Sequence, residues 1–303
     1  MLNSVKYLFL ASILFLFSCK NDNASKIQDK ELITLQGEFD KSPNDSNYEK
    51  LITKYLQLIQ ANRTDKSLVE SLLLKAANSS EKLGKDSQQL VFLNNLIKDF
   101  PQRADTKENI LKMINLLSKL GKKQASEVMA LSFAKGFSNE TKAQEFKASI
   151  TSAASPEDYI LNIGKAIFAD TAKGFSEQDA LAYVDACEAF ALVLPKDPEA
   201  PEFINKAAEI SNALKTYDKS FSLYDWLNNS YSDNKRGQMA LFMKAFLFDE
   251  SLKDVENARK YYQEFIDKYP NHEFAKQAKL LMENLGKSQE EVLKSLQGKN
   301  KDK

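Results

Sequence analysis

Three side chains stand out as candidates for covalent or metal chemistry: Cys19, Cys187 and His272, the single histidine. A serine or cysteine nucleophile would need His272 as its base, but no candidate nucleophile lies near it in the sequence. A zinc site needs three or four protein ligands, mostly nitrogen or sulfur, which this set cannot supply. The glycines are isolated, so there is no glycine-rich phosphate loop. The sequence therefore predicts no catalytic residue, no metal site and no cofactor, and we do not expect an enzyme.

Two of these side chains have an ordinary structural interpretation. Cys187 lies in a helical-looking run, where a free cysteine is expected to be a small buried apolar residue. His272 follows Pro270 and is expected to be a solvated turn residue.

Cys19 stands at the end of a targeting segment. Lys6 and the amino terminus carry positive charge, and the run Tyr7–Phe17 is apolar except for one serine. A helix of this length is too short to span a bilayer, which needs about 20 residues, but it suits the apolar centre of a signal peptide. The sequence Leu16-Phe17-Ser18-Cys19 resembles a lipobox, with an aliphatic residue three positions before the cysteine and a small residue directly before it. An ordinary secretory signal with a coincidental cysteine is the alternative.

The lipobox resemblance implies that residues 1–18 are removed as a lipoprotein signal peptide and that Cys19 is lipidated. Each buried methylene contributes about 0.8 kcal/mol, so several acyl chains would anchor the protein firmly to a membrane. Residues 19–45 are expected to form a flexible tether with a possible short helix. Lys20 and Asp22 directly after the cysteine weakly resemble the export signal of surface-exposed lipoproteins in Bacteroidota-type bacteria, although a plain tether is the preferred interpretation.

The overall composition favours helices and excludes two classes of partner. The chain has 42 basic and 42 acidic residues, so it shows neither the electrostatic footprint of a nucleic-acid-binding protein nor a polybasic patch for lipid. Glycine (9) and proline (7) are scarce, which disfavours sheets with tight turns. The 19 phenylalanines and 11 tyrosines supply enough apolar mass for a core.

A repeat is clearest near the C-terminus, between about Gln238 and Asn271. Two apolar helical stripes are separated by a short turn at Leu252–Ala258, and Pro270 ends the second helix. The second stripe is formed by Ala258, Tyr261, Tyr262, Phe265, Ile266 and Tyr269.

The same turn recurs earlier in the chain. Leu83-Gly84-Lys85 and Leu120-Gly121-Lys122 are 37 residues apart, and Leu214-Lys215-Thr216 lies 38 residues before Leu252. A fifth turn is expected near Gly174–Ser176. These units resemble tetratricopeptide (TPR) repeats, whose period is about 34 residues. The resemblance implies an all-α, TPR-like superhelix (solenoid) of about five helix pairs plus capping helices, with a concave groove lined by the first helix of each pair. A bundle of generic amphipathic helices is the alternative.

The array is expected to be interrupted once. A helix expected over Lys142–Thr151 breaks it, and Ser155 caps a new helix that starts at Pro156. We therefore expect an N-terminal TPR-like half over residues 46–155 and C-terminal repeats over 156–286, followed by a short helix and charged tail over 287–303. A capping helix is expected over Asn47–Asn62, and Ser46 and Glu49 have the spacing of a capping box.

These features lead to a functional hypothesis. TPR grooves hold extended peptides or helices, so we expect a membrane-anchored, non-catalytic scaffold that binds a protein partner in the cell envelope. The expected location is the outer membrane, facing the periplasm or the cell surface, and no nucleic acid or small-molecule ligand is expected. The C-terminal half resembles the repeat regions of envelope TPR proteins such as the Tol–Pal coordinator and BamD-like lipoproteins. The alternative is a SusD-like surface lipoprotein that binds glycans or nutrients, although those chains are larger and carry long loop insertions.

Overall fold

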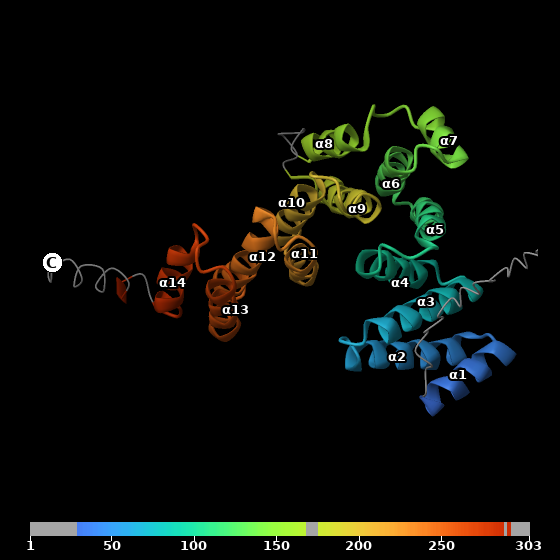
Figure 1. Cartoon of the computed structure of the whole chain (residues 1–303), viewed down its shortest axis with the longest axis horizontal. Helices are drawn as coiled ribbons and strands as arrows, with labels where there is room; N and C mark the ends of the chain where they lie inside the picture. Colours follow the sequence, from blue (N-terminus) through green and yellow to red (C-terminus); the bar gives the residue numbers. More distant parts are fainter. Residues whose placement is uncertain (1–28, 168–174, 288–289, 292–303) are drawn as a thin grey trace, which may run out of the picture. The chain divides into compact units, whose positions relative to one another are not determined.

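The computed structural model describes residues 29–167, 175–287 and 290–291 (Figure 1). These residues form α-helices joined by short turns and contain no strand, which confirms the predicted all-α fold. The described residues divide into two compact units, with the boundary between Leu72 and Leu73. The signal peptide, Cys19, Gly174 and most of the helix predicted after Lys287 lie outside the described residues.

The first unit contains α1 (Lys30–Lys41), α2 (Asp45–Ala61) and the beginning of α3 (Lys66–Lys82). The rings of Phe39 and Tyr48 pack at 6.1 Å between centroids and join α1 to α2. The predicted capping box is wrong. The side chain of Asn44 accepts a hydrogen bond from the backbone N–H of Asn47, and asparagine caps as well as serine does, so α2 begins earlier than expected.

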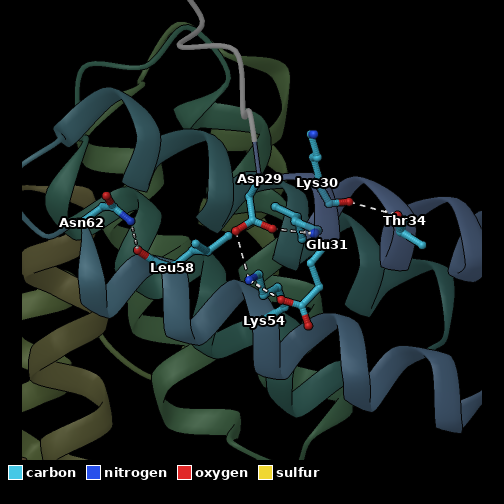
Figure 2. A network of polar contacts seen from close by, with 8 residues as sticks. Asp29, Lys30, Glu31, Thr34, Lys54, Leu58 and Asn62 are labelled. Atoms are coloured by element: carbon cyan, nitrogen blue, oxygen red, sulfur yellow. Dashed lines mark hydrogen bonds and ion pairs between the residues drawn. The ribbon is translucent and has the colours of Figure 1, made fainter.

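A polar cluster fixes the start of α1 against α2 (Figure 2). The Lys54 ammonium lies 3.0 Å from Asp29 and 2.6 Å from Glu31. Asp29 also caps α1 by accepting a hydrogen bond of 2.7 Å from the Leu32 N–H. This backbone bond and the neighbouring Lys54 ammonium hold the pKa of Asp29 below its usual value. One lysine therefore serves both the helix cap and the contact between the two helices.

The second unit continues the helical array. Consecutive helices pack on one another from α4 to α7 and from α8 to α14. The helices are α4 (Asp86–Asp99), α5 (Thr106–Lys119), α6 (Lys123–Gly136), α7 (Thr141–Ser149), α8 (Pro156–Ala166), α9 (Glu177–Val193), α10 (Ala200–Ala213), α11 (Tyr217–Ser230), α12 (Lys235–Phe246) with the π-helical turn Leu247–Ser251, α13 (Val255–Lys268) and α14 (Ala275–Asn284).

The turns predicted from spacing share one backbone geometry. Gly84, Gly121, Lys215 and Lys253 all have φ between 54° and 76°, in the left-handed region. In three of these turns the next N–H donates to a carbonyl five residues back, for example from Lys122 to Leu117 at 2.9 Å. This is the Schellman motif at the C-terminal end of a helix, in which glycine is favoured at the left-handed position. Because the first helix of each of these pairs ends with a left-handed residue, the repeat predicted from the sequence is confirmed in the backbone structure.

Two serines repeat one contact within their helix pairs. The Ser126 hydroxyl donates to the Ile114 carbonyl at 2.9 Å, and the Ser220 hydroxyl donates to the Ala208 carbonyl at 2.8 Å. Both serines are buried and stand five residues after the left-handed residue of their turn. Ala258 is the buried residue at the same position of the last pair. The sequence pattern placed Ala258 on the apolar stripe of its helix but did not identify Ser126 and Ser220 as its equivalents, although the small size of all three residues was the available signal.

The predicted interruption is present as α7, and the array restarts at α8. Ser155 has extended backbone angles, its hydroxyl accepts from the Asp158 N–H at 3.1 Å, and Pro156 is the first helical residue. We expect Ser155→Ala to lower the stability of the second unit by about 1 kcal/mol, because the N–H loses its acceptor. Chemical denaturation would measure this, with Ser155→Asn as the control that restores a cap. A loss of equal size in both variants would contradict a capping role.

The interruption changes which helices stack. In the later pairs, the second helix of one pair packs against the first helix of the next, as α9 does on α10 and α11 on α12. α6 instead packs mainly against α9, the second helix of its successor pair, and only lightly against α8 (Figure 1). Lys135 of α6 strengthens this junction by bonding Asp197, just beyond α9, at 2.7 Å and Glu157 at the start of α8. Two second helices are therefore brought face to face.

Candidate partner-binding surface

A hollow of about 380 Å³ opens beside this junction, between α4, α5, α6, α9 and α11. We call it the second-helix hollow, because four of these five helices are the second members of their pairs. Its apolar part is lined by Leu90 and Val91 of α4, Met113 and Leu117 of α5, Met129 of α6, Ala189 and Leu192 of α9, and Trp226 of α11.

This position differs from the expected one. The TPR resemblance implied a groove lined by the first helix of each pair, whereas only α5 contributes a first helix to this hollow. The physical reason is the junction of α6 with α9, which turns second helices toward a common space. The expectation of a first-helix groove is therefore not met at this hollow.

The apolar lining combines buried and exposed side chains. Trp226, the only tryptophan in the chain, is 6% exposed and lies against the hollow with its ring mostly covered. Val91 is 57% exposed, although α4 buries Phe92, Leu93 and Leu96 close to it in the sequence. The exposed part of the Val91 side chain is therefore available to contact an apolar group of a partner.

The charged lining is partly neutralised within the protein. Lys219 of α11 pairs with Glu188 of α9 at 2.5 Å, and Lys122 pairs with Asp185. The remaining cation, Lys98, donates to the amide oxygen of Asn95 at 3.1 Å and pairs with no carboxylate among the described residues. The hollow therefore has three ammonium groups and two carboxylates, and its surplus positive charge is at Lys98.

Cys187 and His272, the described residues considered for chemistry, both lie in packed surroundings. Cys187 is buried in α9, and burial raises the pKa of its thiol, which disfavours the reactive thiolate. His272 lies in the turn after α13 as predicted, but it is half-buried rather than solvated. Its ring packs edge-on against Phe265 at 5.2 Å, and its Nδ1 accepts from the Phe274 N–H at 3.2 Å. Both side chains support helix packing.

The described residues offer neither a metal site nor a membrane-spanning helix. Within residues 29–167 and 175–287, no group of three or more histidine, cysteine, aspartate or glutamate side chains is arranged to hold a metal ion. None of the helices in those ranges has the length and apolarity that crossing a membrane requires.

The comparisons with known proteins agree with the repeat geometry. The family model described as tetratricopeptide repeat matches residues 239–272, which cover most of α12, its π-helical turn and all of α13. A search of curated proteins finds no match to this sequence. The chain thus carries a tetratricopeptide repeat at α12–α13, and the turns of the pairs α3–α4, α5–α6 and α10–α11 share its left-handed residue.

Proposed function

We propose that this chain is a lipid-anchored, non-catalytic TPR scaffold that binds a protein partner in the cell envelope. The observation that carries the binding role is the second-helix hollow, because it leaves Val91 and Lys98 available on a repeat architecture of a kind that generally binds proteins. The envelope location rests on the sequence alone, on the apolar run Tyr7–Phe17 and the lipobox-like Cys19. By resemblance, the membrane would be an outer membrane and the protein would face the periplasm or the cell surface.

A single substitution tests the anchor. In a host that processes lipoproteins, we expect the wild type in the membrane fraction and Cys19→Ala in the soluble fraction, because the variant has no thiol to acylate at the lipobox position. Cys187→Ala is the matched control, since it removes the buried cysteine and should remain in the membrane. Fractionation and the intact mass of each form would measure this. A soluble wild type without acyl mass would disprove the anchor and leave the binding role untouched.

The partner is identified by what co-purifies with the wild type from detergent-solubilised membranes. We expect a specific envelope protein that is retained after crosslinking and lost from a variant with an altered hollow. Repeated purification without any specific partner would contradict the scaffold role, whatever the location of the chain.

The glycan-binding alternative is less well supported. Sugar rings stack on exposed aromatic faces, whereas Trp226, the aromatic residue that lines the hollow, is only 6% exposed. Saturable binding of an oligosaccharide in calorimetry would restore this alternative.

A further inference from the structure

We propose that the second-helix hollow binds an extended segment of the partner protein in which an aliphatic side chain and an aspartate or glutamate stand about three residues apart. The aliphatic side chain contacts Val91, and the carboxylate pairs with Lys98. The inference rests on the proposed scaffold function and adds the surface and the chemistry of the partner.

The spacing comes from one stripe along α4. Val91, Asn94 and Lys98 lie at positions i, i+3 and i+7 of the helix, and all three line the hollow. At 1.5 Å per residue, the rise from Val91 to Lys98 is about 10 Å. An extended chain advances about 3.3 Å per residue, so a segment running along α4 covers this rise in about three residues.

The charge of the hollow selects an acidic segment. Lys122 and Lys219 are already neutralised by Asp185 and Glu188, so they offer little to a ligand. Lys98 interacts only with the neutral amide of Asn95 among the described residues. A carboxylate on the incoming segment would balance the surplus charge of the lining.

The side chain between these two contacts favours an extended backbone over a helix. Asn94 is half-buried, and its amide makes no hydrogen bond within the described part of the chain. An extended segment has free backbone N–H and C=O groups that such an amide can bind, whereas a helix satisfies most of its own. Asn94 therefore lies where the main chain between the aliphatic and acidic residues would pass.

The test uses the full wild-type chain in detergent and a library of displayed random ten-residue peptides. We expect enriched peptides to pair an aliphatic residue with an acidic one about three positions away. Synthetic tryptophan-free versions are then titrated, and the fluorescence of Trp226, the only tryptophan, reports occupancy of the hollow. Replacing the acidic residue of a peptide with its amide should weaken binding about fivefold, the scale of one exposed ion pair.

Matched variants of the protein complete the test. Val91→Ser should weaken binding about tenfold through lost apolar contact. Lys98→Gln should weaken it about as much as the amide peptide does, and Lys98→Glu more. Leu280→Ser on α14 is the control: this residue is 52% exposed, as Val91 is 57% exposed, but lies outside the hollow. Because the replaced side chains are exposed or half-buried, thermal melting of the variants should stay close to the wild type.

The outcomes separate the inference from the function on which it rests. Enriched peptides that bind Val91→Ser and Lys98→Glu as tightly as the wild type would place binding elsewhere and overturn the inference, while the scaffold role survives. Enriched peptides without acidic residues would overturn the proposed chemistry. If the folded wild type enriches no peptide, both the inference and the peptide-binding function fail.

Discussion

Replacing Gly237 with alanine is expected to destabilise the second unit by about 3 kcal/mol, the upper range for overpacking a close contact. A Cβ atom at Gly237 would lie 1.8 Å from the carbonyl oxygen of Tyr231 and 2.9 Å from that of Leu227. Both oxygens belong to the backbone at the end of α11, so no side-chain rotation can relieve the clash. The start of α12 would have to move away from α11.

Denaturant unfolding of the variant and the wild type would measure this loss. Gly37→Ala in α1 is the matched control, because a Cβ there meets nothing within 4 Å. That variant should be stabilised by about 0.5–1 kcal/mol, the usual gain of alanine over glycine within a helix. If Gly237→Ala is tolerated as well as Gly37→Ala, the close approach of α11 and α12 is wrong.

The inter-helix turns could be predicted because their signal is local. A glycine after an apolar stripe marks a left-handed end of a helix, and this identified Gly84 and Gly121. Lys215 and Lys253 adopt the same conformation without being glycine. The turn at Lys253 was predicted from the apolar stripes on its two sides, and the turn at Lys215 from its likeness to that turn 38 residues later. The restart at Ser155 and Pro156 was also correctly predicted, since cap and proline preferences concern a few neighbouring residues.

The hollow could not be predicted because it depends on which helices meet. Helical periodicity shows that α6 and α9 have apolar faces, but it does not show that those faces pack on each other. In the sequence, Asn94 and Lys98 are indistinguishable from a solvated helix face. They become candidate binding residues only because the fold places them around one hollow with residues of α9 and α11.

Phe242 is the second position where a large effect is expected. Its side chain is 4% exposed and packs among Tyr262, Phe265 and Phe274, with ring centroids 5.7, 5.6 and 5.4 Å away. It thus joins α12 to α13 and to the residue that precedes α14. We expect Phe242→Ala to cost about 4 kcal/mol, since removing a buried phenylalanine side chain leaves a cavity and also loses the ring contacts.

The loss at Phe242 should be local, because each repeat of such an array contacts only its neighbours and α12–α14 form its last described part. Hydrogen exchange should show lost protection in α12–α14, with α4–α6 protected as in the wild type. Phe246→Ala is the matched control on the same helix: Phe246 is 37% exposed, and its loss should cost about 1 kcal/mol. Equal costs at the two positions would contradict the register of α12. A uniform loss of protection would instead mean that the second unit unfolds as one cooperative body. The destabilisation would then be transmitted through α10 and α11 to the helices that line the hollow.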